Sequence, residues 1–210
     1  MSISPDLPDA RGTRATLDAL DDQQRRTARE LRPSPLGLYL PWGLGYLVAF
    51  GAVWLAAGPD AVLPAAVAMV ATVVAGVVPL VASGITVGRS TRGLSGPSRR
   101  TSTMYGWSWV LGFAALMTVL ARLDTTGMPV ATASLMWTGA CLVLVGVLFL
   151  AGGMLWPGSG QYVLGVWILA SAVVAVLAGY PSNLLLLAVL GGGGMIVLAV
   201  VAHLRSRRPA

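Results

Sequence analysis

The sequence predicts an all-α, polytopic membrane protein: six transmembrane helices in three antiparallel hairpins, preceded by a cytoplasmic amphipathic helix. Three observations predict this fold class. The chain is 56% hydrophobic, only 10% of its residues are charged, and it contains six long apolar runs. A soluble domain of this length would be roughly one quarter charged. We therefore expect the apolar runs to be covered by lipid or by one another.

The first element is a predicted cytoplasmic helix over residues 13–32, within an N-terminal segment that ends near residue 36. Its leucines follow helical spacing: Leu17, Leu20 and Leu31. Acidic residues lie early in this helix and arginines lie late, which complements the helix dipole. Pro33 and Pro35 are expected to stop it before the membrane. It is either a solvated helix whose arginines meet anionic lipid, or a docking helix for a second copy or a cytosolic partner.

The next six elements are the transmembrane helices of a domain spanning residues 37–205, which a cytoplasmic tail over residues 206–210 follows. A helix needs roughly 20 apolar residues to cross about 30 Å of hydrocarbon. Six runs reach about this length: Leu38–Gly58, Ala61–Val87, Met104–Ala121, Val130–Met154, Tyr162–Gly179 and Leu184–Leu204. Their length and lack of alternation exclude single β-strands.

Very short outer connections favour three tight antiparallel hairpins, formed by helices 1–2, 3–4 and 5–6. A weak internal repeat supports this division. Each odd-numbered helix opens with an aromatic-x-Leu-Gly tetrad: Trp42–Gly45, Trp109–Gly112 and Tyr162–Gly165. Chance similarity in Gly- and Leu-rich sequence is the alternative explanation. If the repeat is real, it implies three related hairpins around a pseudo-threefold axis.

The arginines predict the orientation, because cytoplasmic loops carry an excess of basic residues. With both ends of the chain in the cytoplasm, thirteen arginines lie inside and only Arg122 lies outside. We therefore expect a bacterial plasma membrane protein. The segment Gly88–Thr103 is the one large inner loop in this prediction. Its arginines are the candidates for docking a cytosolic partner: Arg89, Arg92, Arg99 and Arg100.

Neither catalysis nor metal binding is predicted from the residues. No Asp, Glu, Lys, Arg or His falls near the centre of a predicted transmembrane helix, so proton transfer through a buried carboxylate is not expected. The one histidine, His203, lies at the inner end of the last helix, away from any nucleophile. Metal ligands are too sparse for a site. We expect no catalytic, cofactor-binding or metal-binding residues and no nucleic-acid partner.

Small residues mark the candidate positions for helix packing or for a hinge. Gly84 and Gly88 form a GxxxG pattern, and four consecutive glycines interrupt the last helix: Gly191, Gly192, Gly193 and Gly194. Missing side chains let helix backbones touch, which is the packing interpretation. The alternative for the run of four is a broken or flexible stretch that lines a cavity.

The stretch Leu17–Arg32, the approach Pro33–Trp42 and the six helices together resemble uncharacterised multi-pass membrane proteins of actinobacteria. Those proteins are often labelled transporters or permeases. The aromatic-x-Leu-Gly tetrads also resemble small acid-resistance membrane proteins built from short repeats. The resemblance rests on the general character of these segments and not on a signature motif, so it implies no functional residues.

Two functions compete at this stage. The first is a non-enzymatic transport component or accessory permease-like subunit in the lipid bilayer, with a separate ATPase or a second copy as a partner. The second is a regulatory or structural membrane protein that holds a cytosolic partner through the N-terminal helix and the Arg-rich loop. An enzyme acting on a lipid would be a third class, and it would need polar residues clustered at one face of the bilayer.

Overall fold

The computed structural model describes residue 19 and residues 35–58, 61–90, 97–156 and 160–206. Every regular element in these ranges is a helix. Six of these helices are long and apolar enough to cross a membrane. The all-α fold with six membrane-length helices is therefore confirmed. The predicted N-terminal helix falls outside the described residues, except for Ala19, and so it stays a prediction.

The first membrane-length pair is α2 (Pro35–Ala57) and α3 (Ala65–Ser90). Helix α2 starts at Pro35, because proline suits the first position of a helix, where its missing N–H is not needed. A Cβ on Gly45 would lie 2.5 Å from the Ala75 carbonyl oxygen, so the two backbones are in contact there. The Trp42 indole also donates a hydrogen bond to the Ser83 hydroxyl over 2.8 Å. These contacts hold α2 against α3.

The second closely packed pair is α5 (Val130–Leu155) and α6 (Gln161–Ala178). Glycines again allow the approach: a Cβ on Gly165 would lie 2.8 Å from the Gly146 carbonyl oxygen. The prediction had placed these two helices in different hairpins. Helix α4 (Pro97–Asp124) packs more sparsely on α5. The division into three hairpins is therefore not confirmed.

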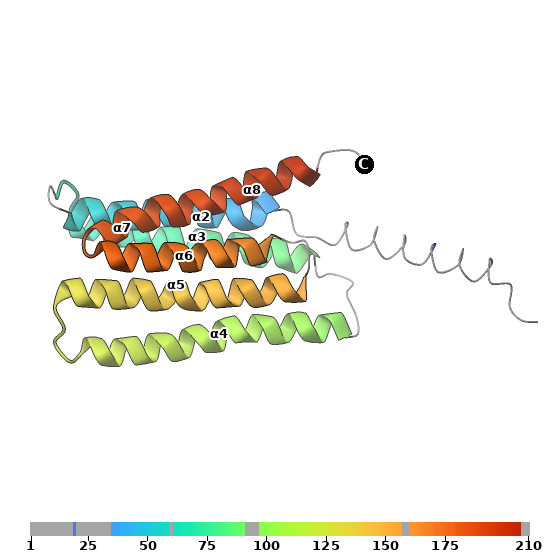
Figure 1. Cartoon of the computed structure of the whole chain (residues 1–210), viewed down its shortest axis with the longest axis horizontal. Helices are drawn as coiled ribbons and strands as arrows, with labels where there is room; N and C mark the ends of the chain where they lie inside the picture. Colours follow the sequence, from blue (N-terminus) through green and yellow to red (C-terminus); the bar gives the residue numbers. More distant parts are fainter. Residues whose placement is uncertain (1–18, 20–34, 59–60, 91–96, 157–159, 207–210) are drawn as a thin grey trace, which may run out of the picture. The chain divides into compact units, whose positions relative to one another are not determined.

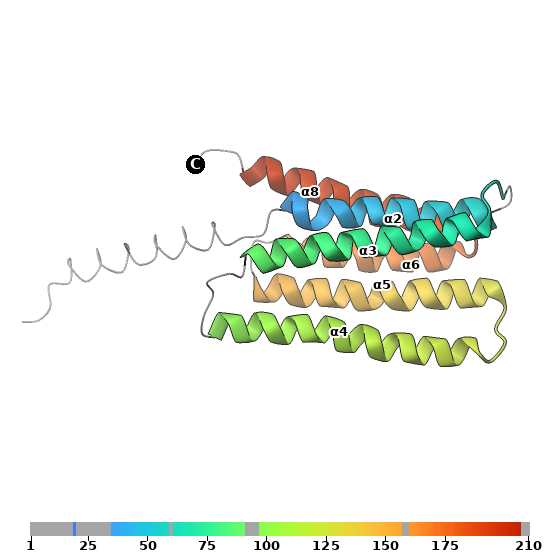
Figure 2. The same cartoon turned by 180° about the vertical axis from the view of Figure 1, so that it is seen from behind.

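The last membrane-length segment consists of three consecutive pieces: α7 (Ser182–Leu186), a π-helical turn η1 (Leu187–Gly192) and α8 (Gly193–Ser206). Figures 1 and 2 show α8 beside α2, with α6 between this pair and α5. Leu187, Met195 and Ala199 of this segment are almost fully buried and join the core formed with α5, α6 and α2. The final segment is thus the most enclosed of the six.

Helix α4 lies at one edge of the bundle (Figure 1) and is fixed to α5 mainly through aromatic side chains. The Tyr105 hydroxyl donates to the Leu148 carbonyl over 2.9 Å. Trp109 meets Phe149 edge-on, with ring centroids 5.7 Å apart. Only 6% of the residues in the apolar window of α4 are buried, against 39% in the final segment. Most of α4 therefore faces outward.

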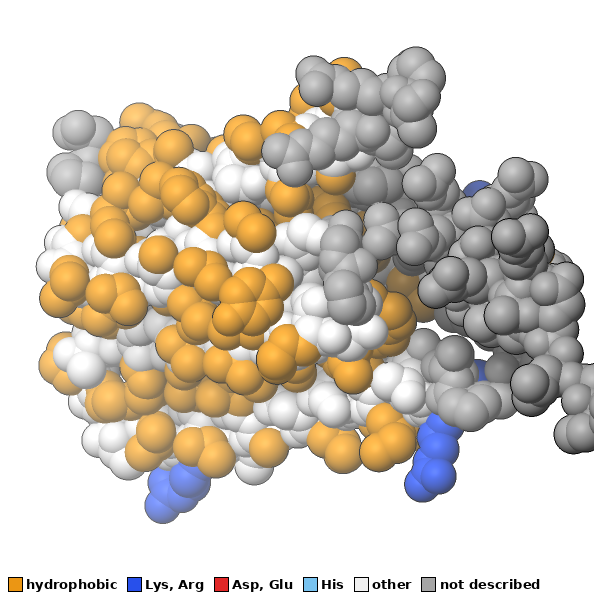
Figure 3. All heavy atoms as spheres, turned by 45° about the vertical axis from the view of Figure 1, so that its right-hand side comes forward, with side chains coloured by type: hydrophobic (Ala, Val, Ile, Leu, Met, Phe, Trp, Pro, Cys, Tyr) orange, Lys and Arg blue, Asp and Glu red, His pale blue; other side chains and the backbone are white. Residues whose placement is uncertain are grey.

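The outward surface is what a lipid-facing bundle requires. Figure 3 shows hydrophobic side chains spread over one face of the molecule, with Lys/Arg side chains towards its two ends. The arginines whose side chains the structure describes lie at the ends of α3 and α4: Arg89, Arg99, Arg100 and Arg122. Exposed valines, leucines and methionines cover the helices between them. The chain is thus an integral membrane protein.

Helix boundaries differ from the prediction mainly at the N-terminal end of α4. This helix begins at Pro97, seven residues before the expected start at Met104. Proline and serine at positions 97 and 98 suit a helix start, so the helix continues into polar sequence beyond its apolar run. The predicted loop Gly88–Thr103 is shorter as a result, since Gly88 lies in α3 and Thr103 in α4.

Candidate functional site

A buried polar cluster lies where the final segment meets α5. The Asn183 side chain is completely buried, and its amide nitrogen donates to the Ser134 and Thr138 hydroxyls over 3.4 and 3.3 Å. The Thr138 hydroxyl in turn donates to the Ser134 carbonyl over 2.6 Å. The Thr138 hydroxyl thus donates its proton to a carbonyl of its own helix and accepts the Asn183 amide hydrogen with a lone pair. The cluster fixes α7 to α5.

The other oxygen of this amide, Asn183 Oδ1, is buried without a hydrogen-bond partner in the structure. A buried acceptor left unsatisfied costs free energy, which other interactions of the same residue offset. Here the contribution is the pair of bonds to α5. Among the described residues, the side-chain bonds of Asn183 go to neutral hydroxyls. Its chemistry is that of a neutral clamp between helices.

The π-helical turn η1 begins four residues after Asn183. A π-helix bonds residue i to residue i+5, so its turn is wider than an α-helical one, and such turns are common at functional sites. The Trp167 indole of α6 donates to the Leu190 carbonyl over 2.8 Å. The same carbonyl accepts the Gly193 backbone N–H at the end of the turn. A side chain from a neighbouring helix thus bonds directly to the widened turn.

The glycine run at this turn meets three different neighbours. A Cβ on Gly192 would lie 2.7 Å from the Gly43 carbonyl oxygen of α2, and one on Gly191 would lie 3.0 Å from the Tyr46 ring. A Cβ on Gly194 would overlap the Trp167 indole. Gly193 alone among the four faces open space. Gly192 and Gly194 therefore have no room for a side chain, and a side chain at Gly191 would fit only if the Tyr46 ring shifted slightly.

The GxxxG glycines of α3 are placed differently. Added Cβ atoms on Gly84 and Gly88 would meet nothing within 4 Å, and the same holds for Gly76 on this helix. Gly84 and Gly88 are one helical turn apart, so they share one exposed face. The side of α3 that packs on α2 is instead lined by Ala75, Pro79 and Ser83. Within the described residues, the position that a Gly84 side chain would take is therefore open.

The predicted docking residues are only partly described. Arg89 lies in the last turn of α3 and is exposed, as are Arg99 and Arg100 near the start of α4. Both helix ends flank the segment 91–96. The remaining candidates lie outside the described residues: Leu17, Leu20, Leu31 and Arg92. The described candidates are therefore exposed cations at the ends of two consecutive helices.

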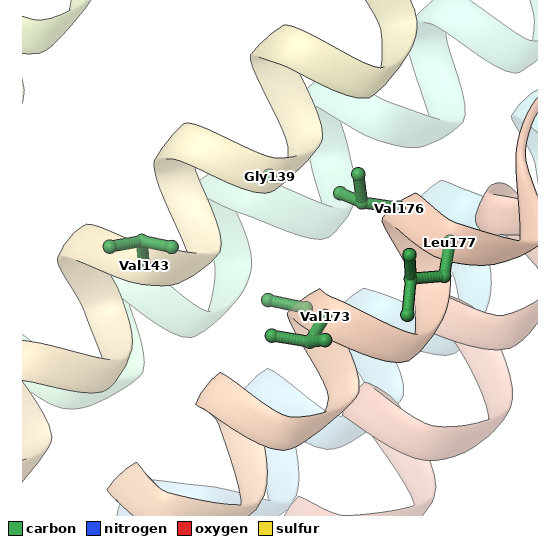
Figure 4. Close-up of a pocket in the computed structure, with 6 residues that line it drawn as sticks. Gly139, Val143, Val173, Val176 and Leu177 are labelled. Carbon is green, nitrogen blue, oxygen red and sulfur yellow. The ribbon is translucent and has the colours of Figure 1, made fainter.

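Two open grooves occur on the described part of the bundle, and both are apolar. One of about 300 Å³ runs between α5 and α6 (Figure 4) and is lined by Gly139, Val143, Ala172, Val173, Val176 and Leu177. The other, of about 390 Å³, lies between α2 and α3 beside Thr72. The Thr72 hydroxyl is bonded to the Ala68 carbonyl over 2.8 Å. Acyl chains fit such linings better than a polar solute does.

Metal ligands do not converge in the described ranges, where no group of three or more His, Cys, Asp or Glu side chains could hold an ion. The lone thiol, Cys141, is free within α5. These findings concern the described residues only. The arrangement offers helix packing and neutral hydrogen bonding.

Sequence reasoning missed the two side chains that distinguish the final segment, Asn183 and Trp167. The prediction starts the last span at Leu184, which places Asn183 in the turn before it and assigns its amide no partner on another helix. An amide in an otherwise apolar span is nevertheless a usable signal, because it must find partners on another helix. Trp167 carries no comparable signal, since its acceptor is a backbone carbonyl 23 residues away.

Comparison of the chain with protein-family models, with curated proteins and with solved structures found no match. The function is therefore argued from the residues and their geometry alone.

Proposed function

We propose that this protein is an accessory, permease-like subunit of a membrane transport assembly, without an enzymatic step of its own. It sits in the bacterial plasma membrane with both ends in the cytoplasm. A separate partner, such as an ATPase, supplies the energy for transport. The observation that carries the proposal is the outward face of α3, where a side chain at Gly84 would meet no atom of the described residues within 4 Å.

Small residues on a lipid-facing helix favour contact with another helix, because they let the two backbones approach closely. Inside this chain, a close backbone approach of this kind already joins α2 to the final segment at Gly43 and Gly192. Helix α3 offers an equivalent surface, and its partner comes from outside the chain. Contact with a second membrane subunit accounts for Gly84 and Gly88 better than contact with lipid alone.

The inner ends of α3 and α4 support the cytosolic part of the proposal. Arg89, Arg99 and Arg100 are exposed and lie on either side of one connecting segment. Arginine forms bidentate hydrogen bonds with carboxylates, so this end suits an acidic surface on a cytosolic subunit. A subunit built in this way couples a membrane partner to a cytosolic one.

Site-directed cross-linking in native membranes tests the proposal. In a Cys141→Ala background, Gly84→Cys carrying a photoreactive maleimide should capture a second membrane protein or an ATPase complex. The matched control is Val163→Cys, which is 68% exposed on α6. A specific partner should appear at position 84 only, and Gly88→Leu should abolish its capture. Equal labelling at both positions, or no product at position 84, would contradict the proposed subunit contact.

Deleting the residues before Pro33 distinguishes this function from a regulatory or structural role. A regulator that holds its partner through the N-terminal segment should lose both the partner and the phenotype. A transport subunit that engages its partners through α3 and the arginines should keep the cross-link at Gly84→Cys. The measurement is the yield of that cross-link with and without the deletion.

A further inference from the structure

The final membrane segment contains a joint between two separately anchored halves. Above the π-turn, Asn183 is bonded to Ser134 and Thr138 of α5. At the other end, Gly192, which is the last residue of the turn, and Ile196 of α8 pack against Gly43 of α2. The six residues Leu187–Gly192 of η1 connect the two anchors. Asn183 lies outside the turn, so a change within η1 can leave its bonds to α5 in place.

A π-turn stores one extra residue in a helix. If η1 returned to α-helical bonding, every residue on one side of it would advance by one position, which is about 100° of rotation. For α8 this rotation would turn Met195 and Ala199, which are now buried, away from the core. The glycine run makes such a change sterically easier, because four consecutive positions carry no side chain.

Trp167 is the side chain that meets the turn from outside the segment. Its indole N–H reaches the Leu190 carbonyl within the turn, and its ring covers the position where a Gly194 side chain would stand. A donor that bonds to a helix carbonyl from the side draws that carbonyl away from the helix axis, which favours the wider turn. The indole therefore stabilises the π form over the α form.

We propose that the final segment is a register switch, in which the π-turn is the joint and Trp167 is the positioning residue that holds it. Release of the indole lets Leu187–Gly192 become α-helical and turns α8 against α2. This inference goes beyond the proposed function, because it concerns a change of conformation inside the chain and needs no partner.

Distances between spin labels test the switch in nanodiscs. In the Cys141→Ala background, one label is placed on Val110→Cys in α4 and the other on Val197→Cys in α8. Both native side chains are more than half exposed, at 57% and 61%. Trp167→Phe keeps an aromatic ring and removes only the donor. It should raise the ratio of a second, rotated distance to the first by about fivefold, as expected for loss of one hydrogen bond.

Two controls separate a switch from simple loosening of the fold. The pair Val110→Cys with Val163→Cys does not cross the turn, so Trp167→Phe should leave its distance unchanged. Deletion of Val189, which is 55% exposed in the middle of η1, removes the extra residue and should lock the segment as a continuous α-helix. In that protein Trp167→Phe should have no effect on the Val110–Val197 distance.

Three outcomes would overturn the inference. The first is a single unchanged Val110–Val197 distance after Trp167→Phe. The second is an equal response of the Val110–Val163 control pair, which would indicate general loosening. The third is a second distance that persists when Val189 is deleted, because a rotation without the extra residue would not come from the π-turn.

Discussion

Two glycine-rich regions of this molecule have the same residue type and opposite surroundings. In the final segment, Gly192 and Gly194 pack against α2 and α6 without room for a Cβ, and Gly191 lies tightly against the Tyr46 ring. In α3, Gly76, Gly84 and Gly88 face open space. Glycine spacing alone therefore does not tell which helix faces are used inside the chain. The contacts of each glycine decide it.

The largest effect is expected where a side chain is forced into the packed region. Gly192→Ala would place a methyl group 2.7 Å from the Gly43 carbonyl oxygen and 2.8 Å from the Leu47 side chain. Overpacking of this kind costs about 1–3 kcal/mol of unfolding free energy. Reversible unfolding in mixed micelles measures it. Gly193→Ala is the matched control, since it meets open space and should leave the stability unchanged or slightly raised.

If Gly193→Ala lowered the unfolding free energy by a similar amount, the glycine run would be sensitive to substitution for a reason other than packing. That result would break the comparison between packed and open glycines.

A smaller effect is expected at the polar clamp of the final segment. Thr138→Val removes the acceptor of one Asn183 hydrogen bond, and interhelical bonds in membranes are worth about 0.6 kcal/mol on average. Thr118→Val is the control, because the exposed Thr118 hydroxyl bonds only to the Ala114 carbonyl of its own helix. Both variants lose a bond within their helix, so the difference in unfolding free energy isolates the bond to Asn183. Equal losses would exclude a contribution from the clamp.

The smallest effect on the isolated chain is expected on α3. Gly84→Leu adds a side chain in open space, so the unfolding free energy should stay within about 0.5 kcal/mol of the parent value. The same variant should lose association with a membrane partner, because the close backbone approach is blocked. Unfolding in micelles and co-purification in mild detergent measure the two quantities. A destabilised monomer would show that this face is used inside the chain.

The six spans were predictable because apolar length is a local property of the sequence. Five of the six helix starts and most ends lie within about four residues of the prediction. The exception is α4, whose first seven residues are polar and include Arg99 and Arg100. A hydropathy criterion does not detect helical turns made of polar residues. Pro97 at the first helical position could have indicated the start.

Which helices pack together could not be predicted, because it depends on contacts between distant residues. The three aromatic-x-Leu-Gly tetrads look alike, yet Gly45 meets α3, Gly112 meets α5, and Gly165 meets α5 and not the final helix. The partners of Asn183 lie 45 and 49 residues away in the sequence. A glycine run is compatible with an α-turn, a π-turn or a break. Only the neighbouring Trp167 and Gly43 distinguish them.

Lipid exposure along two helices tests the central claim most directly, namely that α3 faces outward and the final segment is enclosed. Single cysteines in the Cys141→Ala protein, with one chain per nanodisc, would be labelled with a lipid-soluble maleimide. Val77→Cys and Val81→Cys on α3, both more than half exposed, should react fast. Ala188→Cys and Ala199→Cys, which are 3% and 0% exposed, should react at least tenfold more slowly. Equal rates at the four positions, or faster labelling of the final segment, would contradict this account.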